Sequence, residues 1–297
     1  MHPVLRLIRP KQWSKGLLVF AAPLFAQKLV EPMGVACTLL AFAAMSLISS
    51  AVYVLNDLID VERDKAHPIK RERPIASGAV SVSTAKVLIV LLLAGGLALG
   101  AILNKTTVVI LITYLLVQVA YNMRLKREPV ADVFCLSLGF VLRASLGAAA
   151  VGVGISGWLL FCTGALALML GFGKRRHEWI LQGDSRTTSR EVLGGYTRPV
   201  LDACLLMAAG GAAMSYGVYS IESPTAISHP LLIATALPVF YGIYRYMYLV
   251  MATDEGGEPE NLLFRDRHIV STVVVFALLA LLALSTGKIS ILETVAG

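Results

Sequence analysis

The sequence predicts an all-α integral membrane protein built from nine transmembrane helices. Hydrophobic residues make up 57% of its 297 residues and charged residues only 15%, whereas soluble domains carry about 25% charged residues. Uncharged stretches recur along the chain, each close to the ~20 residues that a spanning helix needs. Lys and Arg gather in alternate loops between these stretches. These three observations together predict a bundle of membrane helices.

The nine expected helices follow from the apolar runs and their interruptions. The first run is short and contains Pro23, and Pro224 and Pro230 delay the start of the eighth helix. Glycines at Gly152–Gly157 mark a turn that divides one long uncharged run into two helices. The expected spans are Gly16–Val30, Met33–Leu55, Val87–Asn104, Thr106–Met123, Val130–Val151, Trp158–Gly173, Ala203–Ile221, Leu231–Val250 and Ile269–Gly287.

The distribution of charge predicts the orientation of the bundle. Net charge is +7, and nearly all Lys and Arg lie in the N-terminal segment and in the loops after the second, fourth, sixth and eighth expected helices. The opposite side has only Lys28, Lys105 and Lys288. Excess Lys and Arg mark the cytoplasmic side, so we expect a cytoplasmic N-terminus and a multi-pass protein of the cytoplasmic membrane. The same loops carry most of the acids, which favours chemistry with metals and phosphates over a merely solvated loop surface.

A cluster of carboxylates closes the second expected helix. Asn56, Asp60 and Asp64 follow one another at i, i+4 and i+8, and Asp57 precedes Asp60 by three positions. These positions share one face of a helix, where like charges repel unless a cation offsets them. Mg²⁺ is usually held by one or two carboxylates together with substrate phosphates. We therefore expect Asn56, Asp60 and Asp64 as metal ligands and Asp57, Asp60 and Asp64 as catalytic residues.

Basic residues follow this cluster at once. The segment His67–Gly78 contains Lys70, Arg71 and Arg73, and its prolines predict an ordered loop. Neighbouring metal-binding acids and phosphate-binding cations suit a pyrophosphorylated substrate. The alternative is a solvated acidic helix end paired with basic neighbours, which explains acids at a helix C-terminus poorly.

Two further residues are candidates because of their position in the expected spans. Arg143 lies at membrane depth, where an ionisable residue is functional by default. It could contact a phosphate or pair with a neighbouring acid such as Asp132, which shares its helix face. Tyr121 could bind a ligand or belong to an interfacial aromatic belt.

The motif Asn-Asp-x-x-Asp-x-x-x-Asp, followed by His-Pro-x-Lys-x-x-Arg-Pro-Ile-Ala-x-Gly, resembles the UbiA-type prenyltransferase superfamily over nearly the whole chain. The resemblance implies a single UbiA-like membrane domain spanning residues 1–297, with nine helices around a central cavity. Members that prenylate aromatic rings carry a second Asp-rich motif after helix 6. This chain has Gly173-Lys174-Arg175-Arg176-His177-Glu178 there instead.

Five other segments resemble the decaprenyl-phosphate phosphoribosyltransferase branch of that superfamily. They are Arg9–Lys15, Tyr121–Lys126, Arg143-Ala144, Gly173-Lys174-Arg175 and Gly257-Glu258-Pro259-Glu260 with Arg265-Asp266-Arg267. In that branch the donor is phosphoribosyl pyrophosphate (PRPP) and the acceptor a polyprenyl phosphate.

The resemblance therefore implies an enzyme that transfers the 5-phosphoribosyl group from PRPP to a polyprenyl phosphate, with Mg²⁺ as its cofactor. The 5-phosphate of PRPP requires cations beyond those that meet its pyrophosphate, and Arg recognises phosphate in bidentate fashion whereas Lys acts as a point charge. The expected partners are PRPP, the lipid phosphate and the bilayer, with no nucleic acid. The candidate substrate-binding residues are Lys15, Arg71, Arg73, Tyr121, Lys126, Arg143, Lys174 and Arg175.

Two alternatives remain open from the sequence. One is a prenyltransferase that moves a prenyl group from a prenyl diphosphate to an aromatic or other small acceptor. The other is a transporter, which would carry several ionisable residues at mid-membrane, whereas Arg143 alone lies clearly at that depth. The cysteines, Cys37, Cys135, Cys162 and Cys204, lie in apolar spans and suggest buried small residues rather than a zinc site.

Overall fold

The computed structural model describes residues 2–66, 68–183, 191–252 and 265–286, and every regular element in those ranges is helical. The Gly257–Glu260 motif lies outside the described residues. Within the described part, seven helices are long and apolar enough to cross a membrane, which confirms a multi-helix membrane protein. The chain divides into two compact units, one of residues 1–123 and 142–154, the other of residues 124–141 and 155–297.

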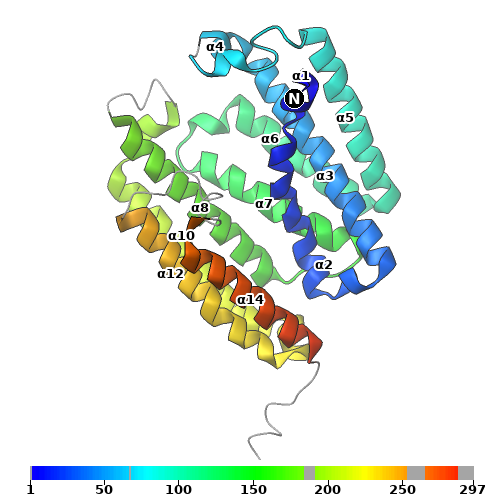
Figure 1. Cartoon of the computed structure of the whole chain (residues 1–297), viewed down its shortest axis with the longest axis vertical. Helices are drawn as coiled ribbons and strands as arrows, with labels where there is room; N and C mark the ends of the chain where they lie inside the picture. The colour runs from blue at the N-terminus through cyan, green and yellow to red at the C-terminus, as the bar shows by residue number, and fades with distance from the viewer. Residues whose placement is uncertain (1, 67, 184–190, 253–264, 287–297) are drawn as a thin grey trace, which may run out of the picture. The chain divides into compact units, whose positions relative to one another are not determined.

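The first unit is organised around α3. Its elements are α1 (Pro3–Ile8), η1 (Pro10–Phe20), α2 (Ala21–Phe25), η2 (Lys28–Val30), α3 (Pro32–Ile59), α4 (Val61–Ala66), η3 (Lys70–Glu72), α5 (Val82–Leu103), α6 (Lys105–Met123) and the second half of α7 (Ala131–Ala150). α3 packs along α5, and η1 lies against α3 (Figure 1). Small residues of α3 such as Ala41 and Ala44 are fully buried, which lets neighbouring helices approach closely, as membrane helices require.

The second unit holds the first half of α7 and a set of paired helices. Its elements are η4 (Leu125–Arg127), α8 (Gly157–Gln182), η6 (Glu191–Gly195), α10 (Arg198–Glu222), α11 (Pro224–Ser228), η7 (Pro230–Thr235), α12 (Ala236–Ala252) and α14 (Arg267–Ser285). α8 packs along α10, and α12 lies beside α14 (Figure 1). Phe172, Leu201 and Val250 belong to the buried apolar cluster that joins these helices.

Two expected spans take a different form from a single long helix. The first is a 3₁₀ helix, η1, followed by the short α2, and the eighth is η7 followed by α12. Prolines stand at the start of η1 and η7 and within α2 and α12, and a proline removes one backbone donor and so disrupts the α-helical pattern. Neither expected span is among the seven candidate spans of the described residues.

The sixth expected helix is longer than its apolar run. We expected it to end at Gly173, where charged residues begin, but α8 continues to Gln182. Lys174, Arg175 and Arg176 are therefore helical rather than part of a loop. The helix continues because Arg175 and Arg176 are buried, 2% and 1% exposed, in ion pairs with acids. The pattern of apolar residues along the sequence does not reveal an ion pair between residues that are far apart in the chain.

Candidate functional site

Two buried carboxylates share one guanidinium in the first unit. Arg73 Nη1 donates to Asp57 Oδ1 at 3.1 Å and to Asp64 Oδ2 at 2.8 Å, and Arg9 Nη2 donates to Asp57 Oδ1 at 2.6 Å. Asp57 and Asp64 are each 2% exposed, whereas the side chains of Arg9 and Arg73 are 29% and 27% exposed. The acids are thus deep in the unit and their cationic partners lie toward its surface.

This arrangement arises from a break in the helix at the motif. α3 ends at Ile59, and Asp60 is its C-cap. α4 begins at Val61, yet the Asp64 N–H still donates to the Asp60 carbonyl at 2.8 Å. The chain therefore continues for another turn with a changed direction, and Asp57 and Asp64 converge on Arg73. Asn56 and Asp60 are partly buried on the same segment, and Arg71 is exposed in η3.

The carboxylate pair has the chemistry that a divalent cation requires. Oxygens from Asp57 and Asp64 already meet at a single point of positive charge, the Arg73 Nη1 atom, and Mg²⁺ takes one or two carboxylates with the remaining positions filled by phosphate and water. Among the described residues no three metal-ligating side chains close into one group. Two carboxylates that converge on one point could hold such an ion together with oxygens of a substrate phosphate.

A second buried polar group of the first unit is centred on Arg143. Arg143 of α7 is 6% exposed, and its Nη2 donates to the Tyr114 hydroxyl at 2.8 Å. Its guanidinium carbon is 4.9 Å from the centre of the Tyr114 ring. In the same unit the guanidinium carbon of Arg9 lies 5.2 Å from the centre of the Tyr53 ring. Arg143 of α7 is thus in contact with a phenol of α6, and its contact with a phosphate stays a prediction.

The cations of α8 fall into two classes in the second unit. Lys174 is exposed, whereas Arg175 is buried and ion-paired. Arg175 Nε donates to Asp132 Oδ2 at 2.6 Å and its Nη1 donates to Glu178 Oε2 at 2.9 Å. Lys126 lies half-buried in η4, and Tyr121 is half-buried in α6 of the other unit. The pairing of Arg175 favours an indirect role, and its direct phosphate contact stays a prediction.

The sequence did not predict which acids and phenols hold these cations, and it suggested Asp132 as a partner for Arg143, whereas Asp132 pairs with Arg175. Asp132 is fully buried and accepts from the Tyr196 hydroxyl at 2.7 Å, and Asp202 accepts from Arg176 Nε at 2.6 Å. The available signal was the presence of single acids, Asp132 and Asp202, next to or within apolar runs, because a charge at such a position needs a partner.

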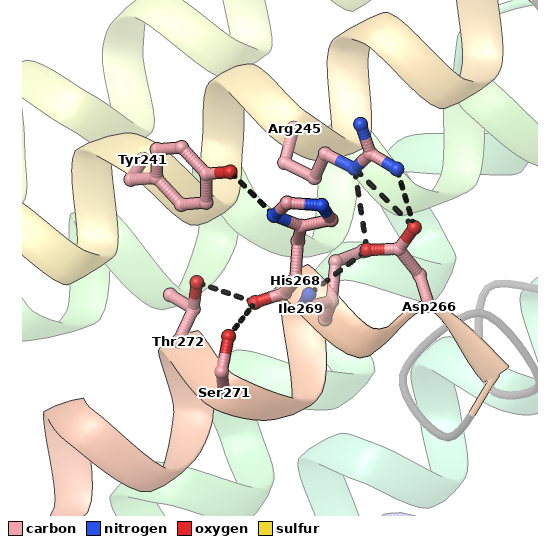
Figure 2. Close-up of polar contacts among 7 residues, drawn as sticks. All are labelled: Tyr241, Arg245, Asp266, His268, Ile269, Ser271 and Thr272. Atoms are coloured by element: carbon pink, nitrogen blue, oxygen red, sulfur yellow. Dashed lines mark hydrogen bonds and ion pairs between the residues drawn. The ribbon is translucent and has the colours of Figure 1, made fainter.

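A third polar cluster explains part of the Arg265–Arg267 motif (Figure 2). Asp266 is the N-cap of α14 and accepts the Ile269 N–H at 2.9 Å. It also pairs with Arg245 of α12 at 2.7 Å, and Tyr241 hydrogen-bonds His268 at 2.8 Å. The Arg245 hydrogen bond holds the pKa of the Asp266 carboxyl below its ordinary value. The charge of Asp266 therefore serves to join α12 to α14.

These features define a class of membrane transferase, and the comparisons with known proteins agree. Residues 17–265 match the model of the UbiA prenyltransferase family. The chain belongs to this family and is an enzyme. A UbiA homologue from Archaeoglobus fulgidus, solved bound to GPP and Mg²⁺, superposes with a TM-score of 0.69 at 19% identity over 96% of this chain and 100% of that one, which confirms the fold.

Two relatives within the family carry the name of a specific enzyme. The decaprenyl-phosphate phosphoribosyltransferase of Mycobacterium tuberculosis is 34% identical over 89% of this chain and 88% of its own length. The enzyme of that name from Corynebacterium glutamicum is 32% identical over 89% of this chain and 81% of its own length. These relatives agree with the branch that the sequence motifs predicted.

Proposed function

We propose that this protein transfers the 5-phosphoribosyl group of PRPP to a polyprenyl phosphate, with Mg²⁺, at the cytoplasmic face of the cytoplasmic membrane. The observation that carries the proposal is the convergence of Asp57 and Asp64 on Arg73. It joins two metal-binding oxygens to cations that suit pyrophosphate. The names of the relatives support the choice of donor and acceptor.

In the proposed site the acidic residues bind the metal ion and the basic residues bind phosphate. Asp64, with Asn56 and Asp60, would hold Mg²⁺, with Asp57 beside them. When bound, the ion would neutralise charge on the departing pyrophosphate. Arg9 and Arg73 are partly exposed, so they can turn from the carboxylates to pyrophosphate oxygens. Lys15, Arg71, Tyr121, Lys126, Arg143 and Lys174 would contact the phosphates of the two substrates.

The reaction itself needs little proton transfer. An oxygen of the lipid phosphate forms a bond to the anomeric carbon as the bond from that carbon to pyrophosphate breaks, through an oxocarbenium-like transition state with inversion. The attacking phosphate is already an anion near neutral pH. Catalysis therefore rests on positioning and on electrostatic stabilisation of the leaving group.

We further propose nine spans with a cytoplasmic N-terminus, in which η1–α2 and η7–α12 serve as the two additional spans. Single cysteines introduced in a cysteine-free background report the side on which each loop lies. Cysteines at Lys70 and Arg127 should react only with a permeant reagent in intact cells, and cysteines at Lys105 and Glu222 also with an impermeant one. Labelling of Lys70 and Lys105 from the same side would contradict the nine-span topology.

The donor is tested by direct competition. Purified protein with Mg²⁺, a polyprenyl phosphate and an aromatic acceptor receives isotopically labelled PRPP and a labelled prenyl diphosphate together, and products are identified by mass. We expect a lipid that carries one phosphoribosyl group, formed only from PRPP. Transfer from the prenyl diphosphate to an aromatic acceptor instead would establish the alternative prenyltransferase activity.

A further inference from the structure

The backbone is strained directly before α7. Val130 has a φ of 68°, in the left-handed region where a β-branched side chain is rarely found. Such a conformation persists only where its surroundings enforce it, and it often marks a functional site. Here the Val130 N–H donates to the Tyr196 hydroxyl at 2.5 Å. Tyr196 is therefore a residue that holds Val130 in its unusual conformation.

The same hydroxyl joins Val130 to a buried chain of charges. Tyr196 donates to Asp132 Oδ1 at 2.7 Å, and the other oxygen of Asp132 accepts from Arg175 at 2.6 Å. Burial raises the pKa of the Tyr196 phenol well above its ordinary value, so the phenol keeps the proton that it donates. Trp179 Nε1 donates to the Tyr196 carbonyl at 3.0 Å, which ties this residue to α8 a second time.

Two cation-bearing segments flank this chain of contacts. One is the turn of η4, where Lys126 is half-buried and Arg127 pairs with Glu191 of η6 at 3.1 Å. This turn also packs tightly on η6, because a Cβ atom at Gly195 would come within 2.5 Å of Pro129 Cγ. The other is the exposed Lys174, which precedes Arg175 on α8. Both segments are thus fixed, through Val130 and Arg175, to the same Asp132 carboxylate.

We propose that Tyr196 and Asp132 are positioning residues that fix Lys126 and Lys174 for recognition of phosphate groups on the donor. Without the Tyr196 hydroxyl, Val130 can relax to a negative φ and the η4 turn changes direction. Prepositioned cations bind phosphate without the cost of ordering them. The inference rests on the proposed function for the identity of PRPP, but its geometry concerns any phosphate-bearing donor.

The test combines a substitution that removes the Tyr196 hydroxyl with one that should make this hydroxyl unnecessary. Tyr196→Phe removes the hydroxyl and should raise the KM for PRPP about tenfold, the equivalent of one charge-assisted hydrogen bond, with little change in the KM for the lipid. Val130→Gly alone should leave both constants near wild type, because glycine adopts a positive φ without support. The double variant should recover PRPP affinity to within about threefold of wild type, since the turn no longer needs the hydroxyl.

A matched control is Tyr246→Phe. Tyr246 is also a buried phenol of the second unit, and its hydroxyl has no hydrogen-bond partner among the described residues. This variant should leave the KM for PRPP unchanged. A purely structural role for Tyr196 predicts a lower melting temperature with an unchanged KM, or a double variant no better than Tyr196→Phe alone. Either result would overturn the inference.

Two further measurements keep the test decisive. If Tyr196→Phe does not fold, Trp179→Phe, which removes the hydrogen bond to the Tyr196 carbonyl and leaves the buried ion pair intact, should produce a smaller loss of PRPP affinity with the same selectivity. If the wild type does not use PRPP, the proposed function fails. The inference is then judged by the Kd for Mg²⁺–pyrophosphate, which should rise about tenfold in Tyr196→Phe and recover in the double variant. An unchanged Kd would reject the inference independently.

Discussion

The two units contain ionic networks of the same chemical type that differ in exposure. In the first unit Asp57 and Asp64 are buried, but Arg9 and Arg73 are 29% and 27% exposed. In the second unit both partners are buried, with Arg175 at 2% and Asp132 at 0%. Partly exposed arginines can give up their carboxylates to a metal ion, whereas a fully buried pair is costly to break. The difference in exposure supports our proposal that the first network exchanges ligands and that the second gives structural support.

The largest expected effect is on the carboxylates of the first network. Asp64→Asn should lower kcat by two to three orders of magnitude, comparable to the loss of a key electrostatic contact in other enzymes. The melting temperature should change little, because repulsion from Asp57 is relieved and Arg73 keeps Asp57 as a partner. Activity and melting of the purified variant provide the check. Glu62→Gln, an exposed acid of the same helix, is the control and should retain activity.

Near-normal turnover of Asp64→Asn with Mg²⁺ present would show that the metal site is misplaced. It would also remove the distinction between the two networks, because in neither of them would the arginines release their carboxylates to a metal ion.

Substitutions in the second network should lower the stability of the fold. Arg175→Met leaves the Asp132 charge buried without its guanidinium and should destabilise the fold by about 3–5 kcal/mol. The double variant Asp132→Asn with Arg175→Met should recover much of that loss, because the buried charge is gone. Thermal unfolding in detergent measures both. If Arg175→Met proves as stable as wild type, then the ion pair with Asp132 does not hold Arg175 in place, and this arginine is available to bind substrate.

Lys174 gives a smaller and more selective effect. Its side chain is exposed next to Arg175, so Lys174→Ala should leave stability unchanged. Loss of a hydrogen bond to a charged group costs roughly 1.5–3 kcal/mol, which corresponds to a rise of about ten- to a hundredfold in the KM for PRPP. Steady-state kinetics with each substrate varied in turn separates the effects. A rise in the KM for the lipid alone would assign Lys174 to the acceptor phosphate.

The pair in Figure 2 should give the smallest effect. The pKa of Asp266 is lowered in the folded state by Arg245, so its contribution to stability is present above the unfolded pKa near 3.9. That contribution is lost as the pH falls through the lower folded pKa. Asp266→Asn keeps an oxygen that can cap α14 and removes only the charge, so it should cost about 0.5 kcal/mol at pH 7, the usual contribution of a carboxylate at a helix N-terminus. The difference from wild type should shrink below about pH 4, and a constant difference would contradict the role of the charge.

The sequence was informative where hydrophobicity and charge pattern are local. It predicted a multi-helix membrane bundle and the family, and it identified Asp57 and Asp64 as candidates, because long apolar runs and a dense acidic motif are visible without any tertiary contact. It did not predict that α8 continues through Arg175, since the acid that stabilises this arginine, Asp132, lies on another helix. The contacts of Tyr196 were hidden for the same reason, because its hydroxyl bonds to Val130 and to Asp132 across a long sequence separation.

The central claim is the transfer of an intact 5-phosphoribosyl group to a lipid phosphate. It is tested most directly by supplying PRPP with one isotope in the 5-phosphate and a second in the pyrophosphate, and by extracting the lipid after one turnover. We predict that the lipid retains the 5-phosphate isotope, that the pyrophosphate isotope is released to the aqueous phase, and that both depend on Mg²⁺ and on Asp64. Transfer of the pyrophosphate isotope to the lipid, or no transfer of either, would contradict the account.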